Sequence, residues 1–138
     1  FRSNLIKPDL AIAVDVGVAY DVPGMTSEKN EGKLGDGPLA ILMDATSIAH
    51  DGLRKHIKDV AEHHNIPVQW ATTPGGGTDA GSIHVANEGI PTITIGVPLR
   101  YMHSNVSVLN IDDYTNSVRL ITEIVRSLND DSYQALMW

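Results

Sequence analysis

The stretch Asp9-Leu10-Ala11-Ile12-Ala13-Val14-Asp15-Val16 is an almost unbroken apolar run with one acid near its end. A run of this length and composition is typical of a β-strand that is buried on both faces of a parallel sheet. Similar runs predict strands from Leu39 to Met43 and from Pro91 to Val97, and an extended segment from Pro67 to Thr72. Asp15 is therefore expected at the end of a strand, where the chain leaves the sheet.

Helical patterns alternate with these strands. Apolar residues recur at helical spacing between Gly52 and His64, and a longer amphipathic pattern runs from Ile111 to Leu128. A short helix is expected from Ala80 to Asn87, followed by Gly89 as a stop signal. This alternation predicts a three-layer α/β/α sandwich around a mostly parallel mixed sheet.

Composition narrows the possible functions. The 138 residues, 42% of them hydrophobic and 20% charged, suit one ordinary domain. No apolar run approaches the ~20 residues of a membrane helix, so we expect no membrane role. A net charge of −7 would repel a nucleic-acid backbone. Because the chain contains no cysteine, disulfides and thiolate chemistry are excluded, and the cytoplasm is the expected location.

Two residues attract attention as metal ligands. Asp15 closes one apolar run, and His103 follows another within Arg100-Tyr101-Met102-His103-Ser104. A carboxylate and an imidazole at the ends of two strands are donor types that a divalent metal site uses. Two structural alternatives stay open: Asp15 as an acid that caps the following loop, and His103 as a buried histidine bonded to backbone.

A glycine loop, Gly75-Gly76-Gly77-Thr78-Asp79-Ala80, leads into the predicted short helix. In one interpretation Thr78 or Asp79 caps that helix. In the other, Gly76, Gly77 and Thr78 border a substrate pocket and donate backbone N–H groups to a carbonyl oxygen or a carboxylate.

Other polar residues carry less weight. The polar segment from Tyr20 to Gly37 is long enough to be a functional loop, but its acids Asp21 and Asp36 are expected to be solvated. The histidines of the predicted helix, at positions 56, 63 and 64, are expected on a solvated face, because they do not form the HExxH pattern of a zinc helix.

Several spaced motifs occur along the chain: Pro8–Val16 with Asp21-Val22-Pro23-Gly24, Gly35-Asp36-Gly37-Pro38, Asn65–Gln69, Gly75–Ala80, Gly89-Ile90-Pro91-Thr92 and Arg100–Ser104. Taken together, these motifs resemble the dinuclear-metal aminopeptidases of the glutamyl and deblocking type, which form tetrahedral dodecamers and include members named endoglucanase or cellulase. The resemblance extends from about Leu5 to Leu128 and implies that residues 1–138 are the C-terminal portion of a metallopeptidase catalytic domain, with the sheet incomplete at its N-terminal side.

The resemblance implies hydrolysis of N-terminal residues from peptides by a water that two divalent ions activate, the ions being zinc, cobalt or manganese. Asp15 matches the terminal carboxylate ligand of one ion and His103 the imidazole ligand of the other. Gly76, Gly77, Thr78 and Asp79 are the implied substrate-binding residues. The family's other ligands and its general-base glutamate have no counterpart here, so no catalytic residue is assigned. The chain alone is expected to be inactive. The resemblance also implies a homo-oligomer, the dodecamer.

Two other functions remain in consideration. An endoglucanase-like glycoside hydrolase needs only two carboxylates, and its activity would not depend on a metal. A non-catalytic fragment would serve assembly, because one ligand per ion falls short of the three protein ligands usual for catalytic zinc.

Overall fold

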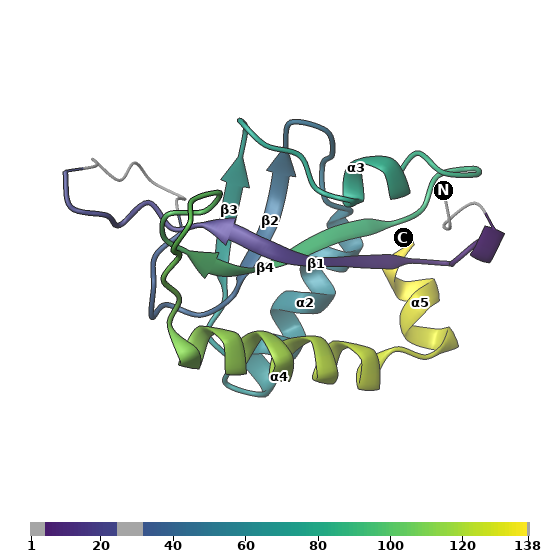
Figure 1. Cartoon of the computed structure of the whole chain (residues 1–138). Helices are drawn as coiled ribbons and strands as arrows, with labels where there is room; N and C mark the ends of the chain where they lie inside the picture. The colour runs from purple at the N-terminus through teal and green to yellow at the C-terminus, as the bar shows by residue number, and fades with distance from the viewer. Residues whose placement is uncertain (1–4, 25–31, 138) are drawn as a thin grey trace.

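The computed structural model describes residues 5–24 and 32–137; part of the predicted loop, residues 25–31, lies outside this range, as do residues 1–4 and 138. The elements are β1 (Ala11–Val18), β2 (Leu39–Asp44), α2 (Asp51–His63), β3 (Gln69–Thr73), α3 (Ala80–Ile83), β4 (Thr92–Leu99), α4 (Ile111–Ser127) and α5 (Asp130–Leu136). From β2 to α4 strands and helices alternate along the chain, whereas β1 precedes β2 and α5 follows α4 directly (Figure 1). Each predicted strand and each predicted helix is therefore present.

The four strands form one mixed sheet in the order β1-β4-β2-β3. The pairs β1/β4 and β2/β3 are parallel, whereas β2 and β4 pair in antiparallel fashion through Leu39, Ala40 and Ile41. In the long pair, Ala11 is opposite Thr92 and Val18 is opposite Leu99. The predicted mostly parallel mixed sheet is confirmed.

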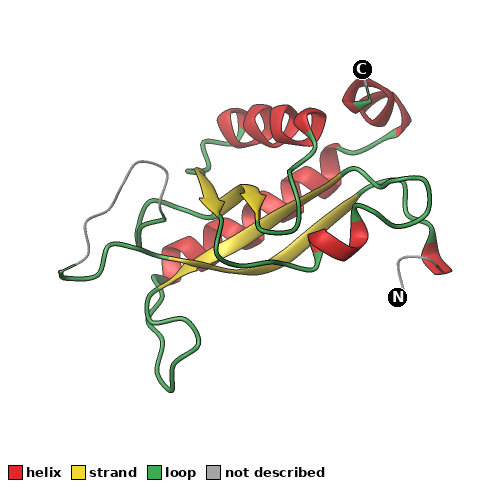
Figure 2. Cartoon of the chain, turned by 90° about the horizontal axis from the view of Figure 1, so that it is seen from above, coloured by secondary structure: helices red, strands yellow, loops and turns green. Residues whose placement is uncertain are grey.

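Helices α2 and α4 cover one face of the sheet, and the short α3 contacts β1 and β4. The main core lies between the sheet and these two long helices, and α4 runs along β1 and β4 (Figure 2). Its buried members come from both layers: Ala40, Ile93 and Ile95 of the sheet, Leu53, Ile57, Val60 and Ala61 of α2, Leu120 and Ile124 of α4, with Ile66 and Leu136. The predicted α/β sandwich is confirmed. In the described part of the chain, no helix is both long and apolar enough to cross a membrane.

Two details of the sequence prediction are wrong. β1 continues to Val18, so Asp15 lies inside the strand rather than at its end, and Val14 and Val16 are 62% and 37% exposed because β1 is an edge strand. Helix α3 has four residues instead of eight, since the chain turns soon after Ile83 and adopts positive φ at Asn87.

Candidate metal and substrate site

Asp15 presents its carboxylate to solvent from β1. Its register partner on β4 is Gly96, which has no side chain that could cover it. The Oδ1 atom accepts a hydrogen bond of 2.8 Å from the backbone N–H of Val16. The side chain is exposed, so a metal ion or a substrate can reach it.

His103 is held in a strained turn directly after β4. Tyr101 and His103 have φ values of 60° and 63°, in the left-handed region that non-glycine residues rarely adopt. Two backbone hydrogen bonds between Arg100 and Val108, of 2.9 and 3.2 Å, close the turn at its base, and the hydroxyl of Ser104 donates to the carbonyl of Tyr101 at 2.6 Å. Strain of this kind often accompanies function. Because His103 is exposed, the buried-histidine alternative is wrong.

An ion pair connects the segments that follow β1 and β4. The Arg100 guanidinium donates from Nε to Oδ1 of Asp21 at 2.9 Å and from Nη2 to Oδ2 at 2.5 Å. These bonds lower the pKa of the Asp21 carboxyl below its ordinary value, against the smaller effect of burial. Asp21, predicted to be a solvated turn acid, therefore fixes the base of the turn that carries His103.

Asp15 and His103 belong to adjacent strand and loop units. β1 and β4 are parallel, and the segments that follow them leave the same end of the sheet (Figure 1). Among residues 5–24 and 32–137, no three His, Asp or Glu side chains gather closely enough to hold a metal ion. A carboxylate and an imidazole are suitable donors for zinc, but a catalytic zinc takes three protein ligands. The described residues therefore fit part of a metal site and do not complete one.

Asp44, at the end of β2, is buried and accepts five hydrogen bonds. Its Oδ1 accepts from the N–H and hydroxyl of Thr46, at 2.7 and 2.8 Å, and from the N–H of Ser47 at 2.8 Å. Its Oδ2 accepts from the N–H and hydroxyl of Thr78, at 3.1 and 2.8 Å. Burial raises the pKa of this carboxyl, but the hydrogen bonds together outweigh burial and lower the pKa to about 2. The Asp44 carboxylate thus clamps the glycine loop to the turn after β2.

The turn that Asp44 clamps also explains why residues 77 and 81 are glycines. A Cβ atom at Gly77 would lie 2.8 Å from Cγ2 of Thr46, and one at Gly81 would lie 2.1 Å from its Oγ1. The Thr78 hydroxyl further lies 2.9 Å from the Thr94 hydroxyl of β4. The loop is therefore held on both sides.

The hydrogen bonds of the glycine loop bear on its two interpretations, helix capping and a border of the substrate pocket. Asp79 occupies the N-cap position of α3 without a side-chain cap hydrogen bond, and the Thr78 hydroxyl is directed to Asp44, so the capping interpretation is wrong. The N–H groups of Gly76 and Thr78 donate within the chain, to a β3 carbonyl at 3.3 Å and to Asp44. Gly77 and Asp79 are exposed. A substrate would therefore meet these two residues rather than the other two N–H groups.

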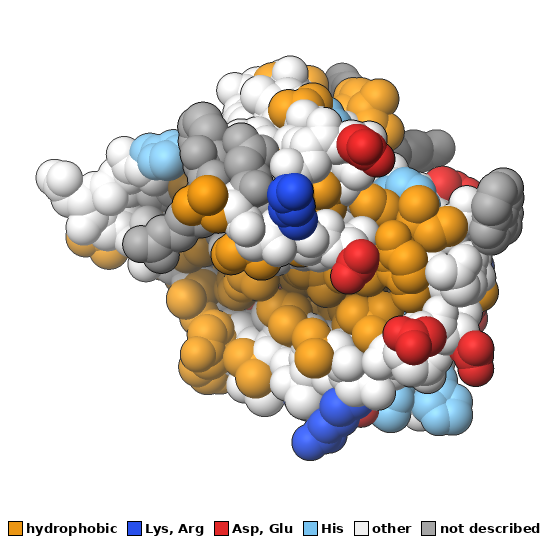
Figure 3. Space-filling model, turned by 90° about the vertical axis from the view of Figure 1, so that its right-hand side faces the viewer, with side chains coloured by type: hydrophobic (Ala, Val, Ile, Leu, Met, Phe, Trp, Pro, Cys, Tyr) orange, Lys and Arg blue, Asp and Glu red, His pale blue; other side chains and the backbone are white. Residues whose placement is uncertain are grey.

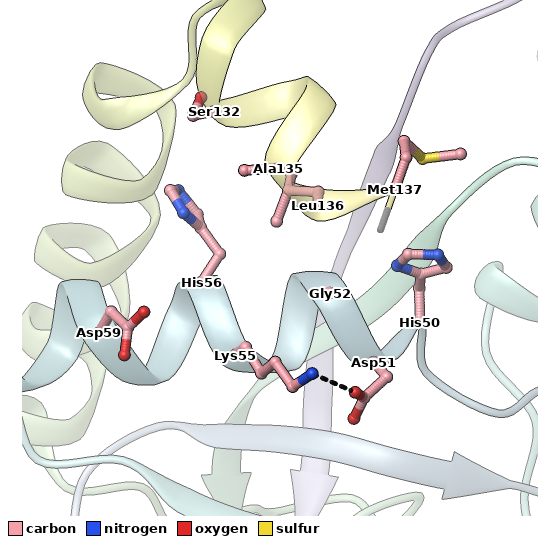
Figure 4. A pocket seen from close by; sticks show the side chains of 10 residues that line it. All are labelled: His50, Asp51, Gly52, Lys55, His56, Asp59, Ser132, Ala135, Leu136 and Met137. Atoms are coloured by element: carbon pink, nitrogen blue, oxygen red, sulfur yellow. Dashed lines mark ion pairs between the residues drawn. The ribbon is translucent and has the colours of Figure 1, made fainter.

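A separate concavity of about 430 Å³ lies between α2 and α5 (Figure 4). In it, Lys55 pairs with Asp51 at 3.1 Å. His56, predicted on a solvated face, instead lies 2.8 Å from the hydroxyl of Ser127, and burial lowers the pKa of its imidazole. None of the predicted site residues lines this concavity. Its lining residues are His50, Asp51, Gly52, Lys55, His56, Asp59, Ser132, Ala135, Leu136 and Met137.

Sequence analysis missed two acids that organise the fold around the site. Asp44 is followed by Thr46 and Ser47, a turn signature that could have indicated its role. Asp113 lies in the first turn of α4. It is 1% exposed and accepts from two N–H groups of the loop before β2, those of Gly35 at 2.7 Å and Gly37 at 2.8 Å.

Comparison with known proteins gives consistent matches. The sequence profile of the M42 glutamyl aminopeptidases matches residues 2–120. A protein of Acetivibrio thermocellus, provisionally named an aminopeptidase, is 42% identical over 87% of this chain and 36% of its own length. The glutamyl aminopeptidase of Lactococcus lactis is 38% identical over 91% of this chain and 34% of its own. This chain thus spans about a third of the length of these relatives.

Solved structures agree. A TET aminopeptidase from a marine-sediment Thaumarchaeota archaeon superposes with a TM-score of 0.93 at 33% identity, over 98% of this chain and 38% of that one. The Pyrococcus horikoshii TET1 peptidase, described as assembling into a tetrahedron or a large octahedral shell, gives 0.71 at 26% identity over 91% and 37%. A Thermotoga maritima protein named endoglucanase gives 0.70 at 26% identity over 96% and 37%.

Proposed function

Because this chain belongs to the M42 glutamyl aminopeptidase family, we propose that it forms part of a metal-dependent aminopeptidase that removes N-terminal residues from peptides. The observation that carries the proposal is the pair formed by Asp15 and His103, which are exposed on adjacent parallel strand and loop units. Both donors suit divalent ions.

In this proposal Asp15 binds one divalent ion and His103 binds a second, and further ligands come from residues outside this chain. The ions, zinc, cobalt or manganese, would polarise the scissile carbonyl and make water a nucleophile near neutral pH. The chain's own part is to orient the two ligands. The Arg100 and Asp21 pair fixes the turn of His103, and the β-ladder with β4 fixes Asp15.

The glycine loop is proposed to border the substrate. Gly76, Gly77, Thr78 and Asp79 form its wall, and the exposed Asp79 carboxylate is placed to attract the positively charged amino terminus of a peptide. Asp44 keeps the loop in position through Thr78. Thr78 thus has a positioning role, whereas Gly77 and Asp79 are the residues that substrate would contact.

The TET neighbours support a homo-oligomer, for which a dodecamer is the proposed form, and peptides are the proposed substrates. We place the protein in the cytoplasm, in keeping with its lack of cysteine.

The test compares this chain alone with a chimera, the Acetivibrio thermocellus relative in which the 120 matched residues are replaced by this chain. Elemental mass spectrometry after dialysis would count the metal ions, and aminoacyl anilide hydrolysis would be followed with and without chelator. We expect about two ions per chimera and chelator-sensitive hydrolysis, but neither for the isolated chain.

Single substitutions in the chimera then test the two ligands. Asp15→Ala and His103→Ala should each lower kcat at least on the order of a hundredfold and reduce the metal content. The matched controls are Asp36→Ala and His63→Ala, which remove exposed side chains of the same types elsewhere. Equal activity in all four variants would overturn the assignment.

A glycoside hydrolase is the second candidate, since a neighbour of the same fold is named endoglucanase. It predicts release of sugar from a soluble glucan that continues in the presence of chelator. A third outcome, a chimera that binds no metal and hydrolyses neither substrate, would support the non-catalytic role in assembly.

A further inference from the structure

The concavity between α2 and α5 has a polar wall and an apolar wall. The α2 wall presents His56 and Asp59, whereas the α5 wall is apolar and ends at Leu136 and Met137 (Figure 4). A volume of about 430 Å³ lies within the range of about 300–1,000 Å³ that is usual for ligand sites. At one end, a Cβ atom at Gly52 would lie 1.9 Å from the carbonyl oxygen of Leu136, so only glycine lets α5 approach the first turn of α2 and close the concavity there.

The hydrogen bonds of His56 determine which of its ring nitrogens carries the hydrogen. The Ser127 hydroxyl donates its single hydrogen to the carbonyl of Ile124, at 2.8 Å. In the 2.8 Å contact with Nε2 of His56, the Ser127 oxygen must therefore accept, so Nε2 carries the hydrogen. Burial lowers the pKa of the His56 imidazole below its ordinary value of 6.5, against the smaller effect of Asp59, and keeps the ring neutral at neutral pH. A neutral imidazole has one N–H, which leaves Nδ1 as an acceptor.

Two acceptors of the α2 wall have no partner within residues 5–24 and 32–137. Nδ1 of His56 makes no hydrogen bond to these residues, and it is open to solvent, since the buried side-chain nitrogen without a partner in this part of the chain is Nδ1 of His50. The Asp59 carboxylate is exposed and forms no ion pair with the described residues. Because Asp59 follows His56 by three residues, the two acceptors lie on neighbouring turns of one side of α2.

The charges around the concavity favour a cation. Of the three charged residues that line it, Lys55 pairs with Asp51 at 3.1 Å, so Asp59 is left without an opposite charge. Arg54 also bonds to Asp51 but does not line the concavity. Over longer distances the net charge of −7 attracts cations. Figure 3, which views the side of the molecule on which α5 lies, shows acidic side chains bordering a hydrophobic hollow.

We propose that the concavity between α2 and α5 binds a primary alkylammonium group, which a lysine side chain or the free amino terminus of a peptide presents. The ammonium donates one hydrogen bond to Nδ1 of His56 and another to the carboxylate of Asp59. Its alkyl carbons pack on the α5 wall, where the flexible thioether of Met137, 41% exposed, adapts to them. A metal ion is a poorer occupant, because no three described His, Asp or Glu side chains converge on one point. The site is separate from Asp15 and His103, neither of which lines it.

Nuclear magnetic resonance of this chain with isotope-labelled histidine tests the proposal. Long-range proton–nitrogen correlations of the free chain should show the His56 ring with its hydrogen on Nε2. Titration with N-acetyl-lysine methylamide, whose one amine is the side-chain ammonium, should shift the Nδ1 resonance saturably at millimolar concentration, because the site is half open to water. Leucine amide carries only an α-ammonium and tests the amino terminus as the source. The uncharged N-acetyl-norleucine methylamide should not bind.

Substitutions separate the site from the general charge of the chain. Asp59→Asn should weaken binding of the lysine probe by about fivefold or more, because it removes the charge and keeps the shape of the side chain. The matched control is Glu62→Gln, which removes an exposed acid of the same helix outside the concavity and should leave the affinity unchanged. Ser127→Ala removes the acceptor of Nε2, so the free His56 ring should show both tautomers and bind the probe more weakly.

A second measurement does not depend on the isolated chain. Calorimetric titration of the chimera uses the lysine probe, which has no free amino terminus that could bind at the proposed metal site. The expected affinity equals that of the chain, and no step involves metal or hydrolysis, so failure of this proposal and failure of the proposed function are distinguishable.

The proposal is overturned by a His56 ring that carries its hydrogen on Nδ1, by the absence of saturable binding with both ammonium probes, or by equal binding of the uncharged analogue. It is also overturned if Glu62→Gln weakens binding as much as Asp59→Asn, since the attraction would then belong to the net charge of the chain. Saturable binding of either ammonium probe supports the proposal, and the probe that binds more tightly identifies the source of the group.

Discussion

The substitution Asp44→Asn removes a buried negative charge that holds two segments together. The Asp44 side chain is 6% exposed, and its pKa is lowered to about 2 from an ordinary value of 3.8. A difference of this size corresponds to about 2 kcal/mol of stability that the ionised carboxylate provides at neutral pH. In Asp44→Asn, an amide NH₂ replaces one of the two carboxylate oxygens. It then faces either the donors of Thr46 and Ser47 or those of Thr78, and a buried donor left unpaired costs about 1–3 kcal/mol.

The lowered pKa of Asp44 determines how the stability difference changes with pH. Because the folded-state pKa is lowered, the contribution of Asp44 is fully present above the ordinary pKa of 3.8 and is lost as the pH falls through about 2. The free energy of unfolding of the unsubstituted chain should therefore exceed that of Asp44→Asn by at least about 2 kcal/mol at pH 7. The difference should shrink steadily between about pH 5 and pH 2.

Urea unfolding followed by circular dichroism at several pH values measures both quantities. Asp36→Asn is the matched control, because Asp36 is an exposed acid in the loop before β2. It should leave the free energy of unfolding within about 0.5 kcal/mol of the unsubstituted chain. The reasoning is refuted if Asp44→Asn is as stable as the control at pH 7, or if its deficit stays constant down to pH 2.

Three further substitutions probe contacts elsewhere. Asp113→Asn should destabilise the chain by about 1–3 kcal/mol in urea unfolding, since only one of two loop N–H groups keeps an acceptor. Gly52→Ala should lower the Tm, although alanine favours helices. The new Cβ would lie 1.9 Å from the carbonyl oxygen of Leu136, so α5 must move away. The chain would then lose about 1.5–3 kcal/mol from the burial of the leucine side chain. Asp21→Asn should speed amide exchange at Arg100, which exchange mass spectrometry measures. It should also remove the stability that the unsubstituted chain has above the ordinary pKa of the Asp21 carboxyl and loses as the pH falls, which acid titration measures.

The strands and long helices were predictable because burial leaves a period in the sequence. The run that became β4 is apolar and β-branched, and the structure buries its first five residues and six of its eight in all. The pattern of α4 repeats every three to four residues, so its bounds were predicted within one residue. α3 was predicted at twice its length because the propensity of residues 84–87 was overridden by the turn at Asn87.

The side-chain contacts around the site, in contrast, leave almost no periodic pattern in the sequence. Asp44 meets Thr78 across 34 residues and Asp21 meets Arg100 across 79, and only the strand order β1-β4-β2-β3 brings these pairs together. A single sequence contains the donors and acceptors but not their pairing. Asp15 and His103 were singled out by their donor types and by their places after two apolar runs, the family motifs matched them to ligands, and their roles as ligands remain predictions.

The wrong prediction for β1 is itself informative. The sequence of β1 has the unbroken apolar character of a strand buried on both faces, yet Val14 and Val16 are exposed. An edge strand that faced water on one side would be expected to alternate apolar and polar residues, because exposed apolar edges promote aggregation. The sequence is therefore suited to a strand in the middle of a larger sheet.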